Sequence, residues 1–200
     1  MSQSFPRPND YTVLIPARQG SKRIPGKNFR PLHPDGRCPV QLAIDVALAA
    51  GYRDIVVSSD RPMPFIVPVR WEIRPAALAG DEVPMIDVVK HCLDLCPRAE
   101  AFLLLQPTQP LRQVRHLAQA AALLRGRDSV VSVGLDTFQR DGTVYAFWRQ
   151  TVIRYGTIYG ENIALMAVPA AETINLNTPE DWARAERRLH EIHRLHSHQP

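Results

Sequence analysis

The sequence predicts an α/β protein with a mostly parallel central sheet and helices on both faces. Short apolar runs alternate along the chain with segments that repeat apolar residues at helical spacing. The runs are apolar almost throughout, which is typical of strands that are buried on both faces. The 200 residues, 45% of them hydrophobic, suffice for one domain over residues 1–200 with a core of its own.

The elements are predicted in order from these patterns. The predicted strands, each a short apolar run, cover residues 11–15, 54–58, 69–73, 101–105 and 129–133. The predicted helices, each with a periodic apolar face, cover residues 40–50, 85–95, 114–124 and 179–193. The last helix has a clear start signal, because Thr178 can cap it and Pro179 suits its first turn.

Two stretches depart from this alternation. Prolines at 62, 64 and 68 argue against a helix over residues 61–68, so we expect an extended connection there. Short alternating patterns over residues 143–175 predict a β-rich section late in the chain. We expect residues 1–10 and 195–200 to be flexible.

Composition excludes several function classes. No apolar run approaches the roughly 20 residues of a membrane helix, and the polar first ten residues lack a signal region, so we expect a cytoplasmic protein. The net charge is +4 and most basic residues are scattered, which argues against nucleic-acid binding. Three cysteines argue against a disulfide framework, and Cys92 and Cys96 fit a helix core better than a metal pair.

A basic loop over residues 17–28 directly follows the first predicted strand. It combines two glycines with four cations, namely Gly20, Gly26, Arg18, Lys22, Arg23 and Lys27. Glycines let backbone N–H groups approach an anion and the cations neutralise it, so the loop predicts a nucleoside triphosphate ligand. It is not a Walker loop, because five residues separate its glycines and Asn28 follows the lysine where Ser or Thr would hold magnesium.

Three further segments place polar side chains beyond predicted strands. Gln106 and Arg112 follow the strand at 101–105, where open α/β sheets bind ligands, although a structural turn also fits. Arg74 leaves the strand at 69–73 and fits a surface salt bridge equally well. Asn175 and Asn177 would share one face of a strand, and they also fit a helix cap.

Taken together and in this order, these segments resemble the cytidylyltransferases that activate nine-carbon sugar acids. These are the N-acylneuraminate cytidylyltransferases, or CMP-sialic acid synthetases, and their pseudaminate and legionaminate relatives. The resemblance extends over residues 11–189, with further support from residues 56–60, 128–133 and 177–181. It implies a three-layer Rossmann-like fold of the nucleotide-diphosphosugar transferase type.

The resemblance also implies an activity. The anomeric hydroxyl of a small anionic sugar acid attacks the α-phosphate of CTP, pyrophosphate leaves, and cations with Mg²⁺ stabilise the developing charge. A catalytic role is implied for Arg18, Lys22 and Lys27. Nucleotide contacts are implied for Ala17, Arg18, Gly20, Ser21, Lys27, Asn28, Arg74, Gly80 and Met85. Acceptor contacts are implied for Gln106, Arg112, Asp141 and Tyr145.

The chain departs from the family at four places. The proline-rich stretch 61–68 replaces the helix that relatives have after the second predicted strand. Where relatives have two aspartates that bind magnesium, it has Asn175 and Asn177, whose amides offer neutral oxygens only, so we expect Mg²⁺ to bind weakly or to arrive with CTP. Met85 stands where relatives have a serine near the cytosine. Residues 134–141 replace a segment several times longer that contributes to the family's homodimer, which weakens the expectation of a dimer.

Three hypotheses follow. The first is an active CTP-dependent cytidylyltransferase acting on a sugar acid of the nonulosonic type. The second is an impaired relative that binds nucleotide through Arg18, Lys22 and Lys27 in a regulatory role. The third is a nucleotidyltransferase for another base or acceptor. The residues do not identify the acceptor.

Overall fold

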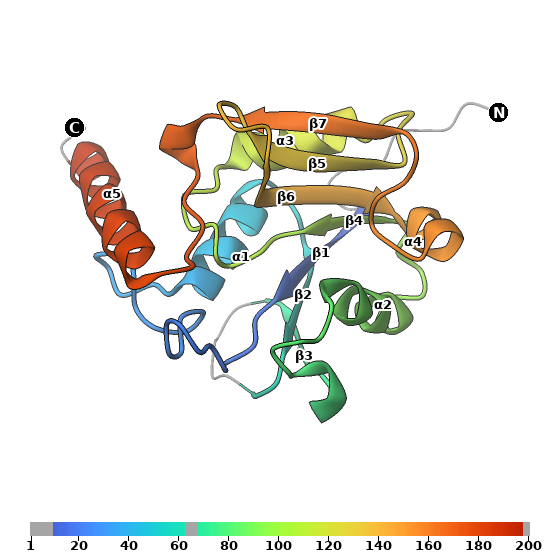
Figure 1. Ribbon diagram of the computed structural model, residues 1–200, viewed down its shortest axis with the longest axis horizontal. Coiled ribbons are helices and arrows are strands. Elements are labelled where there is room, and N and C mark those ends of the chain that lie inside the picture. The colour runs from blue at the N-terminus through green and yellow to red at the C-terminus, as the bar shows by residue number, and fades with distance from the viewer. Residues whose placement is uncertain (1–9, 63–67, 198–200) are drawn as a thin grey trace.

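The computed structural model describes residues 10–62 and 68–197, except the side chain of His196, and it confirms the predicted α/β architecture (Figure 1). The strands of its single seven-stranded sheet are β1 (Tyr11–Pro16), β2 (Asp54–Ser59), β3 (Arg70–Ile73), β4 (Ala101–Leu104), β5 (Ser129–Gly134), β6 (Arg140–Trp148) and β7 (Ile163–Val168). The α-helices are α1 (Pro39–Ala49), α2 (Met85–Leu95), α3 (Val114–Leu123), α4 (Arg149–Tyr155) and α5 (Pro179–Ser197).

The strand order is β3-β2-β1-β4-β6-β5-β7. Neighbouring strands are parallel except at β6, which runs antiparallel to both β4 and β5. Because β1, β2, β3 and β4 are parallel, their carboxyl ends meet at one edge of the sheet. The strand order reverses direction between β1 and β4, and open sheets of this kind bind ligands at such a switch point.

Helices cover both faces of the sheet. Apolar residues of α1 and α3 pack on one face with the odd-numbered residues of β1, and α2 and α4 pack on the other face around Leu14 and Phe102. Helix α5 lies against one end of the sheet (Figure 1), where Trp182, Ala185 and Leu189 pack on apolar residues from the loops. Each residue of the core strand β1 is buried, as its continuous apolar pattern predicts.

The predicted bounds agree with the five strands and the first three helices to within one residue at each end. Helix α5 continues past the predicted end at residue 193 to Ser197, so residues 195–197, which we expected to be flexible, are helical. Thr178 caps α5: Asp181 N donates to Thr178 Oγ1 at 3.2 Å, and Thr178 N donates to Asp181 Oδ2 at 3.0 Å.

The late section that we predicted to be β-rich contains two strands, but it also contains a helix that the patterns did not predict. β6 and β7 are present, but the seven-residue helix α4 separates them, and residues 157–159 form no strand. Helix α4 buries only Thr151 and Val152, so its apolar periodicity is too short to recognise, and Gly156 ends it in the left-handed conformation at φ 69°. Residues 61, 62 and 68 are not helical, and the rest of the proline-rich connection lies outside the described residues.

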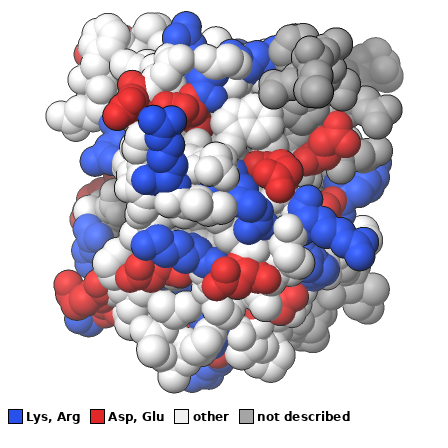
Figure 2. Space-filling model, turned by 90° about the vertical axis from the view of Figure 1, so that its right-hand side faces the viewer, with Lys and Arg blue, Asp and Glu red and all other residues white. Residues whose placement is uncertain are grey.

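Within the described residues, no helix is long and apolar enough to cross a membrane. The cysteines Cys38, Cys92 and Cys96 are buried and unbridged, as the core interpretation of Cys92 and Cys96 predicts. On the face shown in Figure 2, acidic and basic side chains alternate and form no extended basic patch. Within residues 134–141, only residues 135–139 form the turn between β5 and β6, and Gly134 N donates to Gln139 O at 2.9 Å across it.

Candidate functional site

Three segments meet at the carboxyl edge of the sheet, beside the switch point. They are the basic loop after β1 (residues 17–28), the glutamine loop after β4 (residues 105–112) and the amide segment before α5 (residues 173–178). An apolar cluster under the site joins them, since Ile24, Leu111 and Leu176 all pack with Trp182 of α5. The site therefore rests on a core of its own, to which each of the three segments contributes.

Backbone and amide hydrogen bonds fix the shape of the basic loop. Ala17 N donates to Ser58 O at 2.8 Å, which ties the start of the loop to β2. Asn28 is buried, and its Nδ2 donates to Arg18 O at 2.8 Å, so the end of the loop is held against its beginning. Gly26 turns the chain at φ 64°, a conformation that glycine adopts without strain.

Two cations of the basic loop pair with a carboxylate from the segment that follows β3. Lys22 Nζ lies 3.0 Å from Asp81 Oδ2, and Arg18 pairs with Asp81 Oδ1. The hydrogen bond from Lys22 has the largest effect on the pKa of Asp81 and the one from Arg18 the next largest, and both hold this pKa below its ordinary value. Asp81 was not predicted as a site residue, because nothing near it in the sequence indicates that it faces the basic loop.

Lys27 reaches in the other direction, to the amide segment. Its Nζ donates to Leu176 O at 2.9 Å, between Asn175 and Asn177. Burial lowers the pKa of Lys27, and the nearby Arg23 and Arg18 lower it further. The amide segment is held in turn by the glutamine loop, because Leu176 N donates to Thr108 O at 3.0 Å.

The two asparagines do not cap α5, which excludes one of the two sequence interpretations. Thr178 provides the cap, and the side-chain amides of Asn175 and Asn177 form no hydrogen bond with any residue in the described part of the chain. Asn175 is exposed and Asn177 is partly buried. Both amides are therefore available to a ligand.

Arg74 is buried and makes no salt bridge in the described part of the chain. Its guanidinium donates to Ser58 O and to Leu78 O, and its Nε is enclosed without a partner. Burial lowers the pKa of Arg74. A few residues on, Gly80 is exposed next to Asp81, so the segment places one buried cation and one exposed anion at the site.

A pocket of about 250 Å³ brings together three of the predicted residues. It is lined by Pro84, Met85, Ile86, Val89, Leu104, Gln106, Tyr145, Thr157, Ile158 and Tyr159. Burial raises the pKa of Tyr145 to about 12, so its phenol stays protonated. Gly142 is required beside the pocket, because a Cβ there would lie 2.5 Å from Gln106 Oε1 at a φ of 80°.

Arg112 and Asp141 are engaged within the protein and do not line this pocket. The buried Arg112 donates through Nη2 to Gln106 O at 2.7 Å and through Nε to Thr143 O. The Asp141 carboxylate accepts from Ser132 Oγ at 2.5 Å and from Thr143 N at 2.9 Å. These contacts support the structural-turn interpretation of Arg112, and direct acceptor contacts by the two residues stay a prediction.

The side chains at the site do not offer the ligands that the protein alone would need to hold a divalent metal ion. Among the described residues there is no group of three or more His, Cys, Asp or Glu side chains that could hold one. Asp181, next to the amide segment, accepts from Asn177 N and Thr178 N and pairs with Arg184 at 3.2 Å. The remaining donors at the segment are the neutral amides, and hard cations prefer carboxylates.

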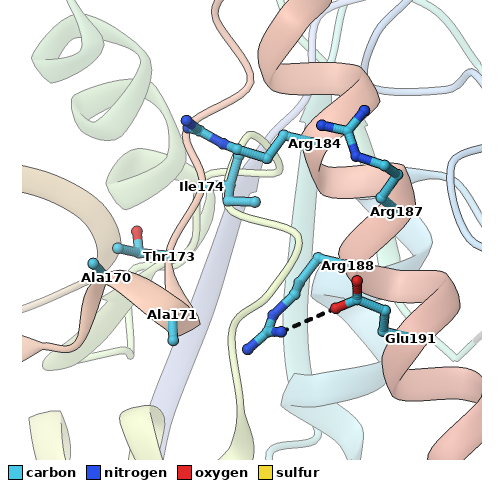
Figure 3. A pocket seen from close by; sticks show the side chains of 8 residues that line it. All are labelled: Ala170, Ala171, Thr173, Ile174, Arg184, Arg187, Arg188 and Glu191. Carbon is cyan, nitrogen blue, oxygen red and sulfur yellow. Dashed lines mark hydrogen bonds and ion pairs between the residues drawn. The ribbon is translucent and has the colours of Figure 1, made fainter.

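A larger cavity of about 420 Å³ lies between α5 and residues 170–174 (Figure 3). Arg188 pairs with Glu191 at 3.0 Å there, and Arg184 pairs with Asp181, each one turn away on the same helix. None of the predicted site residues lines this cavity. Two of its arginines are paired within α5, and because Thr173 and Ile174 of the amide segment also line it, the cavity borders the candidate site.

Comparison with known proteins gives a consistent set of similarities. The family model described as cytidylyltransferase matches residues 12–139. The CMP-N,N'-diacetyllegionaminic acid synthase of Legionella pneumophila is 29% identical over 88% of this chain and 94% of its own length. The N-acylneuraminate cytidylyltransferase of Escherichia coli is 31% identical over 60% of this chain, but the match spans only 30% of that enzyme.

Solved structures share the fold. The structure of CMP:2-keto-3-deoxy-manno-octonic acid synthetase complexed with CTP matches with a TM-score of 0.70 at 16% identity, covering 91% of this chain and 99% of the other. A Mycobacterium tuberculosis protein in complex with manganese matches with a TM-score of 0.64 at 16% identity, covering 88% and 97% of the two chains.

Proposed function

This chain belongs to the cytidylyltransferase family, and from that premise we propose that it transfers CMP from CTP to a sugar acid of the nonulosonic type. The observation that carries the proposal is the convergence of the three segments on one apolar cluster, with Lys27 joining the basic loop to the amide segment. This convergence places cations, free amides and a small pocket at one edge of the sheet.

The reaction is a displacement at phosphorus. The anomeric hydroxyl oxygen of the acceptor forms a bond to the α-phosphorus of CTP and loses its proton to solvent water. The bond from that phosphorus to the oxygen bridging to the β-phosphate breaks, and pyrophosphate leaves with the electron pair. Negative charge grows on the phosphate oxygens, so the fixed cations Arg18, Lys22 and Lys27 stabilise the transition state by their position.

CTP binding requires Asp81 to give up its partners. In the protein without nucleotide, Asp81 pairs with Arg18 and Lys22. The triphosphate carries more negative charge than one carboxylate, so it replaces Asp81 on the same two cations. Backbone N–H groups of Gly20 and Ser21 then face the phosphates, while Ala17 stays bonded to β2 and Asn28 keeps the loop in shape through Arg18 O.

The cytosine and the acceptor are assigned to the two sides of Met85. Arg74, with a buried and unpartnered Nε, and Gly80 line the approach for the base. The pocket of about 250 Å³, with Gln106 and Tyr145 in its wall, takes the acceptor. In this proposal Arg112 and Asp141 act by positioning, since they hold the backbone around Gln106 and Thr143.

A divalent cation enters this proposal only with the nucleotide. The relative with bound manganese shows that a protein of this fold can hold such an ion, but the neutral amides of Asn175 and Asn177 do not fit one bound by the protein alone. We therefore assign Mg²⁺ to the CTP complex and assign every step described above to the protein's own residues.

A second function is favoured by one specific observation. The metal-binding aspartates implied by the family are replaced by Asn175 and Asn177, which suits a protein that binds CTP without turnover. Pyrophosphate release from CTP separates the two functions, when it is measured with a panel of nonulosonic and octulosonic acids. Release that needs both CTP and an acceptor supports the transferase. Thermal stabilisation by CTP without release on any acceptor supports the binding protein.

The matched variants are Lys27→Met and Lys90→Ala. Lys90 is an exposed cation on α2 that belongs to none of the three segments and does not line the pocket of about 250 Å³. Loss of release in Lys27→Met with retention in Lys90→Ala supports the proposed site. Equal release from the two variants contradicts it.

A further inference from the structure

We propose that the Lys27 ammonium is the resident cation of the nucleotide site, and that this chain binds CTP without needing a divalent metal ion. The inference rests on the proposed function, because it concerns how the same site holds the triphosphate. It adds that the Lys27 ammonium takes the place of a metal ion bound by the protein.

The position of Lys27 is fixed on both sides. Its Nζ lies 2.9 Å from Leu176 O, the carbonyl between the two asparagines. Leu176 is fully buried, and its N is bonded to Thr108 O at 3.0 Å, so this carbonyl cannot move away without disturbing the core below. Asn28, the next residue along from Lys27, is anchored to Arg18 O. The ammonium therefore stands where the free amides and the basic loop meet.

The charges around this position favour a lysine and disfavour a metal ion. Arg18 and Arg23 lie close enough to Lys27 to interact with it electrostatically, so the nearby field is already positive. Asn175 and Asn177 contribute dipoles but no negative charge to offset a dication. A doubly charged ion would face repulsion from the ammonium without the carboxylates that normally compensate it.

Two carboxylates beside the three segments, Asp181 and Asp81, already have partners. Asp181 holds the first turn of α5 through Asn177 N and Thr178 N, and it pairs with Arg184. Asp81 lies on Arg18 and Lys22. If Asp181 bound a metal ion, the first turn of α5 would lose its acceptor. If Asp81 bound one, Arg18 and Lys22 would lose their partner. The basic loop and the amide segment therefore present one ammonium group and two side-chain amides to a polyanion.

The test is calorimetric titration of CTP into the protein, in EDTA and in Mg²⁺. For the wild type we expect dissociation constants that agree within about threefold between the two conditions. Lys27→Met keeps the aliphatic stem, and we expect it to weaken CTP binding in EDTA by about tenfold or more. The control Lys90→Ala should match the wild type, and circular dichroism checks that each variant is folded.

The double variant Asn175→Asp with Asn177→Asp supplies the reverse arm. It adds two negative charges beside Lys27, so we expect it to bind Mn²⁺ without nucleotide, which electron paramagnetic resonance detects, and to bind CTP about tenfold more tightly in Mg²⁺ than in EDTA. A double variant without Mn²⁺ binding would overturn the placement of these positions. Mn²⁺ bound to the nucleotide-free wild type would overturn the inference as well.

The remaining outcomes separate this inference from the proposed function. Wild-type CTP binding in Mg²⁺ that is lost in EDTA overturns the resident-cation role and leaves the proposed function standing. Absence of CTP binding in both conditions overturns both. Unchanged CTP affinity of a folded Lys27→Met variant in EDTA overturns the inference even if the wild type binds without metal.

Discussion

The basic loop and the amide segment lie at the same edge of the sheet but hold their places by different means. The basic loop is charged, and hydrogen bonds such as the one from Asn28 to Arg18 O shape it. The amide segment has no charged side chain between Thr173 and Thr178, and buried apolar residues fix it. The difference shows that one edge of the sheet combines a charged loop shaped by hydrogen bonds with an uncharged segment fixed by apolar packing, and the proposed triphosphate site lies between them.

The largest expected effect comes from removing the apolar anchor of the amide segment. Leu176→Ala leaves a cavity under the site, and buried Leu→Ala changes typically cost about 2–5 kcal/mol of unfolding free energy. Leu165→Ala is the matched control, because Leu165 is 62% exposed. Chemical denaturation of both variants measures the effect. Similar losses of unfolding free energy in the two variants would show that Leu176 stabilises the protein no more than an exposed leucine does.

Removing Arg18 and Lys22 from the basic loop should change binding more than folding. We expect Arg18→Ala combined with Lys22→Ala to weaken CTP binding by about a hundredfold or more, since charge-assisted hydrogen bonds contribute about 1.5–3 kcal/mol each. Melting temperatures should stay near that of the wild type. If CTP affinity is unchanged, the triphosphate does not bind at this loop.

Asparagines in the two regions should respond differently to truncation. Asn28→Ala removes the bond that closes the basic loop and should cost about 1 kcal/mol of stability. Asn175→Ala removes an exposed amide that has no partner in the described structure, and its stability should be unchanged. Thermal denaturation compares the pair. A larger loss for Asn175→Ala would mean that the amide segment is also held by its polar groups.

The smallest expected effect is a gain. Asp81→Asn frees Arg18 and Lys22 from their internal partner, so CTP should bind about two- to fivefold more tightly at low salt. The gain should shrink as ionic strength rises, which calorimetry in two salt concentrations can follow. Weaker binding in this variant would show that Asp81 supports the nucleotide site and does not compete with the nucleotide.

Much of the fold could be predicted because its strands are buried on both faces and therefore read as continuous apolar runs. The direction of β6 could not, since antiparallel pairing to β4 and β5 depends on partners distant in the sequence. Helix α4 escaped detection because only one turn of it is buried.

Several residues of the candidate site could be predicted from the sequence, but the contacts between them could not. The sequence identified the basic loop and Asn175 and Asn177, yet the contact from Lys27 to Leu176 spans 149 positions and has no local signal. Arg112 shows the opposite limit: its charge suggested a ligand contact, but the folded chain surrounds it with carbonyl groups. A charged residue in a loop indicates a site only when its partners are known.

The most direct test of the contrast between the two regions is a crystal structure of the protein with CTP and Mn²⁺, using the anomalous signal of manganese. We expect the triphosphate to contact Arg18, Lys22 and Lys27, with any manganese bound only to phosphate oxygens and water. A manganese ion ligated by Asn175 or Asn177, with Lys27 displaced from Leu176 O, would contradict this expectation.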